Sequence, residues 1–290
     1  MNVRKVREIL DSHRQLEGGG FVVRRPFPGE RVDHVDPFLL IDEMGPIDYA
    51  RGEAVGAPDH PHRGFETVTY VLEGEMEHED SAGHRGRLRP GDVQWMTAGA
   101  GIVHSEMPSR RIREEGGRVH GFQVWVNLPR RDKMMRPRYQ EVSGAKLPVA
   151  SVPGASVRVV AGEALGVKAA IDTRTPIVFQ DWTLEPGADV TVPFEPGLRM
   201  MAYVFEGEAR VGDRLVRDGQ LAILGDGDAV RLGGGRGRVL LLGGVPLNEP
   251  VARYGPFVMN TRSELLEAFE DFQSGKMGEI TRSAEVRTSA

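Results

Sequence analysis

The chain contains no cysteine. Disulfide bonds are therefore excluded, and any metal site must be built from histidine and carboxylate side chains. The sequence also lacks an apolar run long enough to span a membrane, and the segment "MNVRKVREILDSHRQLEGGG" at its start lacks the apolar core of a signal peptide. These absences predict a cytoplasmic protein with no membrane association.

A strong charge of one sign is also missing. The 37 basic and 42 acidic residues leave a formal net charge of only -5. Proteins whose main partner is nucleic-acid phosphate usually carry a strongly basic balance. We therefore expect no direct binding to nucleic acid.

Helical periodicity is rare in this sequence. The 37 glycines and 19 prolines favour short strands joined by tight turns, and alternating runs such as "FETVTYVLEG" and "VHGFQVWVNLP" are strand signals. One helix is predicted near the C-terminus, where Thr261–Glu264 forms a capping box. Four apolar residues after it share one helical face: Leu265, Leu266, Phe269 and Phe272. The predicted class is all-β with a short C-terminal helix.

An internal repeat predicts two similar domains. The segment Tyr70–Glu75, "YVLEGE", recurs as "YVFEGE" at Tyr203–Glu208. Each copy is followed by a hairpin and a glycine turn into an apolar strand, "PGDV" in the first and "DGQL" in the second. Self-similarity on this scale indicates a duplicated domain. We place a linker at Pro129–Val142 and predict domains at 1–135 and 136–250, followed by the helix and tail at 251–290.

The histidines point to a metal site in the first copy only, because all eight lie at or before residue 120. Residues i and i+2 of a strand point to the same face, roughly 6–7 Å apart. His60 and His62 have this spacing, and His104 and Glu106 repeat it in "GIVHSEMP". If the two segments face each other across a barrel, three nitrogens and one carboxylate oxygen converge. Such a set suits Fe(II), Mn, Ni, Co or Cu(II), with two positions left open on an octahedral ion.

Other candidate ligands are less favoured. Glu66 has the same parity, but four residues of extended strand put it about 13 Å from His62. Only a bulge at Gly64 would bring it back, so an acid behind the ligands or on the strand surface is the preferred interpretation. His78 is predicted to be exposed on its strand, and His120 to be structural.

Several segments resemble the pirin family of the cupin superfamily. They are "GGGFVVRRPFPG", "DPFLLIDEMGP", "DHPHRGFETVTYVLEGEMEHED", "GDVQWMTAGAGIVHSEMP" and "PFVMNT…AFEDFQSGKMG". The resemblance implies a bicupin, in which two cupin β-barrel (jelly-roll) domains lie face to face and the N-terminal one holds the metal. Carried over by motif, the ligands are His60, His62, His104 and Glu106. Fe(II) is the preferred ion, with Mn, Ni, Co, Cu or Zn as alternatives.

The second copy is expected to bind no metal. Aligning the repeats places four non-equivalent residues opposite the ligands: Pro193, Glu195, Leu232 and Gly234. None of the pairs of positions reproduces the histidine spacing. The alignment of the repeats therefore predicts that the second barrel is a structural or partner-binding copy.

Pirins resemble quercetin 2,3-dioxygenases, which implies the oxidative ring opening of a flavonol by O₂. In this reading Glu106 is the candidate catalytic base for the substrate hydroxyl. A small planar phenolic substrate requires an apolar pocket. Five residues are predicted to form its walls: Phe65, Trp95, Met96, Met107 and Phe122.

Two alternatives remain open at the level of sequence. The first is a metal-binding regulatory protein that binds a transcription factor or a metabolic enzyme, with contacts made by "RRDKMMRPR", including Met134 and Met135. The same charge cluster is more commonly a solvated linker. The second is a cupin that acts on another small phenolic compound or metabolite.

Overall fold

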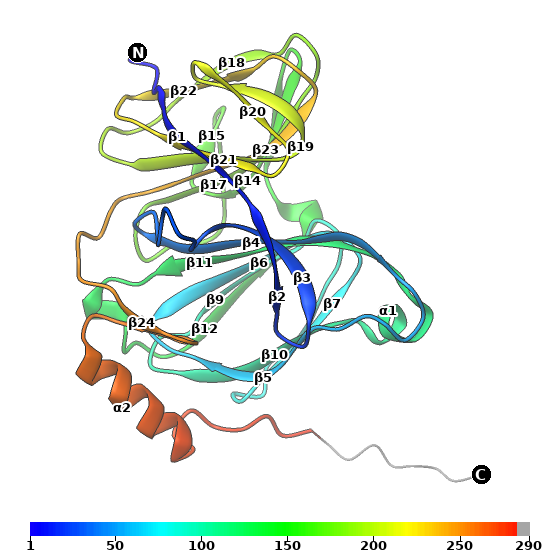
Figure 1. Cartoon of the computed structure of the whole chain (residues 1–290), viewed down its shortest axis with the longest axis vertical. Helices are drawn as coiled ribbons and strands as arrows, with labels where there is room; N and C mark the ends of the chain where they lie inside the picture. The colour runs from blue at the N-terminus through cyan, green and yellow to red at the C-terminus, as the bar shows by residue number, and fades with distance from the viewer. Residues whose placement is uncertain (283–290) are drawn as a thin grey trace.

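The computed structural model describes residues 1–282, and most of these residues form β-strands. Figure 1 shows two β domains stacked along the long axis of the molecule, with a helix near the C-terminal end. The predicted all-β class with a C-terminal helix is confirmed. Within residues 1–282, no helix is both long and apolar enough to cross a membrane.

The first domain consists of two sheets that enclose a barrel interior. The seven-stranded sheet has the order β12 (Arg138–Val142), β9 (Val93–Thr97), β6 (Phe65–Glu73), β11 (Gly117–Asn127), β4 (Phe38–Tyr49), β3 (Phe21–Phe27) and β2 (His13–Glu17). The four-stranded sheet has the order β5 (Ala57–His62), β10 (Ile102–Pro108), β7 (Met76–Asp80) and β8 (Arg85–Leu88). A short helix, α1 (Arg110–Glu115), follows β10.

The second domain is built around one ten-stranded sheet. Its main path is β1 (Val6–Asp11), β21 (Gln220–Leu224), β19 (Arg199–Val211), β23 (Gly237–Gly244), β17 (Ile177–Leu184), β14 (Ala155–Ala161) and β13 (Val149–Val152). The strands off this path are β18 (Asp189–Pro193), β20 (Arg214–Arg217) and β22 (Ala229–Gly233). A small ribbon joins β15 (Glu163–Ala164) to β16 (Val167–Lys168).

A shared core joins the two domains. Phe122 and Trp95 of the first domain belong to the same buried apolar cluster as Phe179 of the second. Two tyrosines cross this interface: the Tyr70 hydroxyl donates to Asp181 at 2.8 Å, and the Tyr203 hydroxyl donates to a carboxylate of β4 at 2.7 Å. The two tyrosines occupy equivalent positions in the repeated hexapeptide, so each copy contributes one hydroxyl to the interface.

The domain boundaries differ from those predicted at both ends of the first domain. The N-terminal strand β1 pairs with β21 in the second domain, and β12, which falls in the predicted linker, pairs with β9 in the first. The rest of the predicted linker holds a short 3-10 helix, η1 (Arg130–Asp132), and a second one, η2 (Gly144–Lys146), lies just beyond it. If the domains were divided at the predicted boundaries, β21 and β9 would each have an unpaired edge, which β1 and β12 cover.

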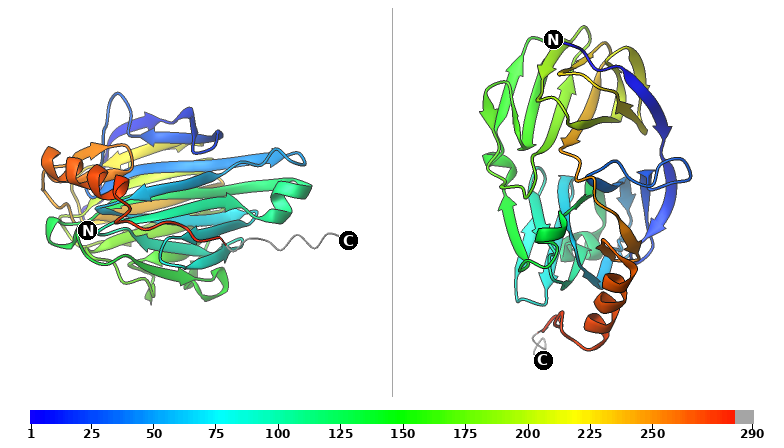
Figure 2. Two further views of the ribbon diagram at one scale, coloured as in Figure 1. Left: turned by 90° about the horizontal axis from the view of Figure 1, so that it is seen from below. Right: turned by 90° about the vertical axis from the view of Figure 1, so that its left-hand side faces the viewer.

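The C-terminal segment returns to the first domain, as the right-hand view of Figure 2 shows. It contains the ribbon of β24 (Ala252–Tyr254) and β25 (Phe257–Met259), followed by α2 (Arg262–Gln273). The Val258 N–H donates to the Arg63 carbonyl, and Arg63 forms a 2.8 Å ion pair with Asp271 of α2. The predicted capping box at Thr261 is present. The remainder of the predicted tail, 283–290, lies outside the described residues.

Lys133 shows that the charged linker segment is not simply solvated. Its side chain is only 1% exposed, and its ammonium donates to the Gly64 carbonyl at 2.7 Å, the Asn127 side chain at 2.6 Å and the Val258 carbonyl at 3.0 Å. Burial lowers the pKa of Lys133 to about 8. This residue therefore ties η1 to the loop after β5 and to the C-terminal ribbon.

Replacing Lys133 with methionine should change the pH dependence of stability. Between a folded pKa of about 8 and an unfolded value of 10.5, only the unfolded chain binds the proton, so stability rises with pH across that window. The variant loses this contribution. Urea unfolding at pH 7 and at pH 10 should show the difference between wild type and variant moving by about 2 kcal/mol in favour of the wild type. The exposed Lys168→Met is the control, and parallel pH curves for wild type and Lys133→Met would contradict the expectation.

Candidate metal centre

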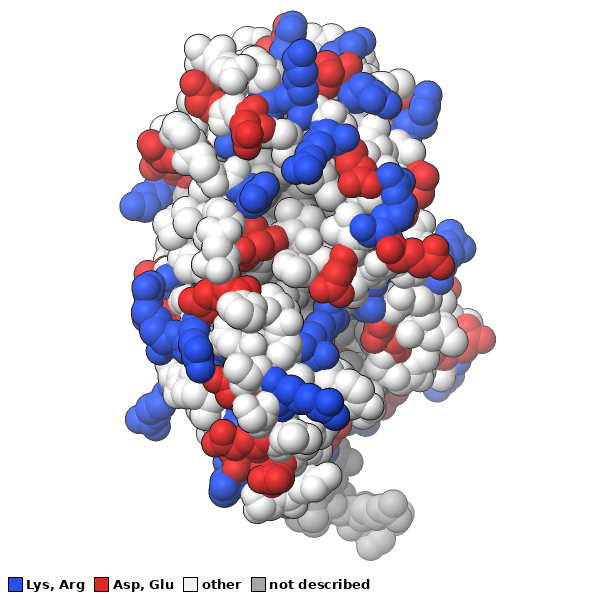
Figure 3. All heavy atoms as spheres, turned by 60° about the vertical axis from the view of Figure 1, so that its left-hand side comes forward, with Lys and Arg blue, Asp and Glu red and all other residues white. Residues whose placement is uncertain are grey.

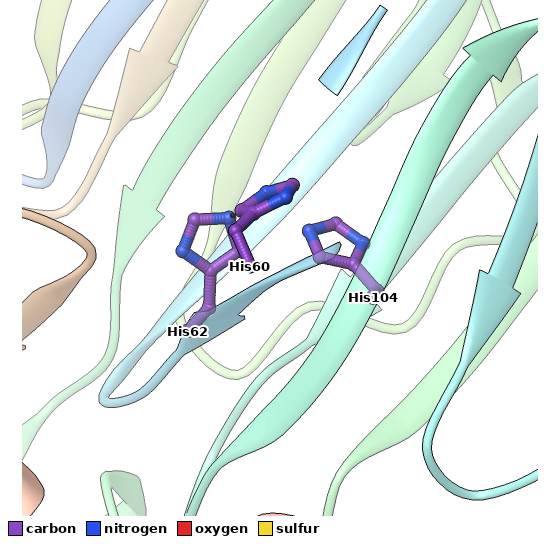
Figure 4. A group of neighbouring side chains, drawn as sticks. All are labelled: His60, His62 and His104. Atoms are coloured by element: carbon purple, nitrogen blue, oxygen red, sulfur yellow. Dashed lines mark hydrogen bonds between the residues drawn. The ribbon is translucent and has the colours of Figure 1, made fainter. Parts of the chain in front are cut away.

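Three histidines meet where β5 and β10 pair. His60 lies directly opposite His104 in the antiparallel register, and His62 follows two residues later on the same face of β5. The ring centroids are 4.6 Å apart for His60 and His62, 4.4 Å for His60 and His104, and 4.9 Å for His62 and His104. Figure 4 shows the three imidazoles turned toward one another. The strand pairing therefore gathers these nitrogens around one point.

Hydrogen bonds to carbonyls set the tautomers of the two β5 histidines. The Nδ1 atom of His60 lies 2.7 Å from the Pro58 carbonyl, and that of His62 lies 3.3 Å from the Pro256 carbonyl. A carbonyl oxygen only accepts, so each Nδ1 carries the proton and each Nε2 presents a lone pair. The two Nε2 atoms face each other at 3.0 Å. Two lone pairs at this distance repel unless a cation lies beside them, as in metal-bound histidine pairs.

His104 has the burial and the unpaired ring nitrogens of a potential metal ligand. It is 1% exposed, and neither of its ring nitrogens has a hydrogen-bond partner within residues 1–282. Burial, followed by the neighbouring imidazoles, lowers the pKa of His62 and of His104 well below the usual value. Both rings are therefore neutral at physiological pH, which is the form that binds metal. The three histidines fit a divalent transition metal.

Glu106 lies on the same face of β10 and is held by two donors. Thr69 donates its hydroxyl to Oε1 at 2.6 Å, and Gln123 donates its amide to Oε2 at 2.8 Å. The β5–β10 register shifts between His104 and Glu106, and such an irregularity turns a side chain away from the regular line. The ligand atoms of Glu106, His104 and His78 lie within 4.8 Å of one another. The four predicted ligands are thus divided between two overlapping groups that share His104: one joins it to His60 and His62, and the other joins it to Glu106 and to His78, which was not predicted as a ligand.

The prediction that His78 is exposed is wrong. The side chain is 2% exposed, its Nε2 lies 2.9 Å from the Tyr139 hydroxyl, and β7 places it directly opposite Glu106. The signal for this position was available, because Met76, His78 and Asp80 share one face of the short strand, and that face is buried. An apolar residue at the start of an alternating strand fixes which face points inward.

Glu66 belongs to neither group of potential ligands in the described part of the chain. It is 1% exposed and accepts a 2.6 Å hydrogen bond from Thr97. Burial raises its pKa. The surface interpretation of this acid is therefore wrong, and Glu66 is a buried, hydrogen-bonded side chain of the sheet.

A cavity of about 550 Å³ opens beside the histidines. His60, His62 and Glu106 line it, together with the two donors that hold Glu106. Most of the remaining wall is apolar and includes Phe21, Leu40, Met44, Ile47, Met76, Val119 and Trp125. Its volume falls in the range of small-molecule sites, about 300–1,000 Å³.

None of the five residues predicted as pocket walls lines this cavity. They are placed elsewhere: Trp95 and Phe122 in the core between the domains, Phe65 beside Leu39 and Val258, Met96 beside Ala98 and Ile102, and Met107 on the other face of β10. For Trp95, Phe122 and Met107 the error is one of strand parity, whereas Phe65 and Met96 lie on the interior face of their strands but outside the cavity. On β11, Phe122 points to the interdomain core, so Gln123 and Trp125 point to the cavity.

Comparison with known proteins identifies the family. Residues 20–126 match the Pirin family model, and residues 179–278 match the model of the Pirin C-terminal cupin domain. Pirin of Homo sapiens is 44% identical over 283 residues, which cover 95% of this chain and 94% of that protein. This chain belongs to the pirin family.

Other members of the comparison agree on the bicupin fold. A pirin-like protein of Solanum lycopersicum is 44% identical, with 94% of this chain and 92% of that protein covered. The crystal structure of a quercetin 2,3-dioxygenase from Acinetobacter baumannii superposes with a TM-score of 0.90 at 38% identity, covering 96% of this chain and 100% of that one. The predicted pirin resemblance and the two cupin domains are both confirmed.

Proposed function

We propose that this pirin-family protein is a metal-dependent dioxygenase of the quercetin 2,3-dioxygenase type, which opens a ring of flavonols. The proposed metal ligands are His60, His62, His104 and Glu106, with Fe(II) as the preferred ion and Mn, Ni, Co, Cu or Zn as alternatives. The observation that carries the proposal is the position of two imidazoles and a carboxylate at the wall of a largely apolar cavity of about 550 Å³. The similarity to the Acinetobacter baumannii quercetin 2,3-dioxygenase supports it.

Three components of the site would contribute to this reaction: a bound metal, Glu106 with its two donors, and the apolar walls. A bound divalent metal would contribute a Lewis-acid and redox centre for the phenolate and for dioxygen. Glu106 would accept the proton of the substrate hydroxyl, while Thr69 and Gln123 keep both of its oxygens in a fixed orientation. The apolar walls would hold the flat ring system and exclude water from the reacting atoms. Both atoms of the dioxygen molecule enter the ring-opened product, and one ring carbon of the flavonol leaves as carbon monoxide.

Quercetin turnover by the Fe(II)-loaded protein is the direct test. We expect one O₂ consumed and one CO released for each quercetin lost, followed by absorbance, an oxygen electrode and CO trapping. Glu106→Gln should lower kcat by about 10²–10⁴-fold, because it removes the proton acceptor and keeps the shape. The control is Glu185→Gln, which alters an exposed acid of the second domain. Metal-loaded protein that consumes no quercetin and releases no CO would refute the dioxygenase proposal.

For the alternative of a regulatory binding protein, the segment proposed to contact a partner offers fewer free charged side chains than the sequence suggests. Of the segment "RRDKMMRPR", Lys133 is buried, Arg130 pairs with Glu264 and Asp132 pairs with Arg174, whereas Met134 is 52% exposed. Basic and acidic side chains are interspersed on the face drawn in Figure 3. A pull-down that returns one stoichiometric partner from a protein without turnover would favour this alternative.

A further inference from the structure

One arginine of the cavity wall has no acidic partner. Arg253 of β24 lines the cavity and is only partly exposed. Its Nη1 donates to the Leu39 carbonyl at 3.0 Å, and its guanidinium carbon lies 5.1 Å from the centre of the Trp125 ring. Within residues 1–282 it forms no ion pair, so most of its N–H groups remain available to a molecule in the cavity.

The other arginine of the wall shows the contrast. Arg25 makes a paired contact with Asp42, with 2.6 Å from Nε to Oδ1, and lies 2.7 Å from Glu17. Both of these acids, which also line the cavity, are therefore already engaged. Burial, and next the charge of Arg25, lower the pKa of Arg253, and the acids Asp33, Asp42 and Glu17, none of which forms an ion pair with it in the described part of the chain, only partly oppose this shift.

Trp125 connects this cation to the metal centre. The centre of its ring system lies 5.2 Å from the His62 ring and 5.1 Å from the Arg253 guanidinium carbon. The distance from the His62 ring to the Arg253 guanidinium carbon therefore cannot exceed the sum of these two distances by more than the size of the Trp125 ring system. A flat molecule of one ring with a short conjugated arm spans such a distance. Its hydroxyl end would reach the histidines while its other end meets the guanidinium.

We propose that Arg253 is a specificity-determining residue that binds an anionic group, such as a carboxylate, at the far end of a planar phenolic substrate. The inference rests on the proposed function insofar as it places the substrate hydroxyl at the metal. Hydrogen bonds between two charged groups are roughly twice as strong as neutral ones, and the cation is already positioned by the Trp125 ring and the Leu39 carbonyl. The favoured substrates are thus acidic phenols rather than neutral ones of the same shape.

Caffeate and methyl caffeate are suitable probes because they share one catechol ring and conjugated arm and differ in the charge of the far end. Zn²⁺-loaded protein at pH 7 allows binding to be measured by calorimetry without redox turnover. We expect the wild type to bind caffeate about tenfold more tightly than the ester. Arg253→Gln should remove this preference, and Arg253→Lys should retain part of it. Arg231→Gln, which removes an exposed, paired arginine of the second domain, should leave it unchanged.

Several outcomes would overturn the inference. They are a wild type that binds neither probe or both equally, and an Arg253→Gln variant that is folded by its thermal transition and keeps the tenfold preference. The result is independent of the quercetin test. A charge preference lost in Arg253→Gln, together with absent CO release, would support this inference and refute the ring-opening reaction. CO release without any charge preference would support the ring-opening reaction and refute the role of Arg253.

Discussion

His62→Ala is expected to abolish stoichiometric metal binding and, with it, turnover of quercetin. The substitution removes one of two lone pairs that face each other at 3.0 Å, together with the hydrogen bond from Nδ1 to the Pro256 carbonyl. Loss of a residue that merely supports a metal ligand costs about 10–100-fold in affinity, so loss of a ligand should cost at least about 100-fold. Elemental analysis after dialysis against a weak chelator, together with calorimetric titration of Mn²⁺ and Zn²⁺, measures the effect.

His84→Ala is the matched control for this experiment. His84 is also an imidazole of the first domain, but it is partly exposed, pairs with Glu141 at 2.9 Å and belongs to neither group of potential ligands. It should keep its metal. If His62→Ala binds metal as tightly as the wild type, the proposed ligand set is wrong. Circular dichroism of both variants separates loss of metal from loss of fold.

The local part of the metal site could be predicted from the sequence because it depends on one strand at a time. His60 and His62 share a face of β5 because their spacing is two, and His104 and Glu106 share a face of β10 for the same reason. The register that places His60 opposite His104 is a property of two strands. The sequence allowed this pairing only as an assumption, and the structure is needed to establish it.

The pocket walls and the domain ends could not be predicted in the same way. Every residue of β6 from Phe65 to Val71 is buried, because one face of the strand lines the barrel and the other packs on the second domain. In such a strand hydrophobicity no longer distinguishes the two faces, and Phe122 of β11 was assigned to the wrong one. Strand pairing across the duplication, as for β1 and β21, joins segments more than two hundred residues apart and leaves no local signal.

Glu43→Ala is expected to be the most destabilising of the substitutions considered. Glu43 is completely buried, and four donor atoms converge on it: two of Arg24 at 2.9 and 2.7 Å, His120 Nε2 at 2.9 Å and the Tyr203 hydroxyl at 2.7 Å. Removing the carboxylate leaves these donors without an acceptor in the interface between the domains. Breaking a buried ion pair by deleting one partner costs about 3–5 kcal/mol. Urea unfolding followed by tryptophan fluorescence measures the loss.

The comparison of Glu43→Ala with two milder variants separates charge burial from simple contact loss. Glu185→Ala breaks an exposed pair with Arg236 and should cost about 1 kcal/mol or less. Tyr203→Phe removes one donor and should cost about 1 kcal/mol. Because Arg24 also pairs with Asp218 of the second domain, losing its Glu43 anchor should weaken the coupling of the two barrels. Their unfolding should then separate into two transitions, whereas a single transition at wild-type urea concentration would show that the shared apolar core alone holds the domains together.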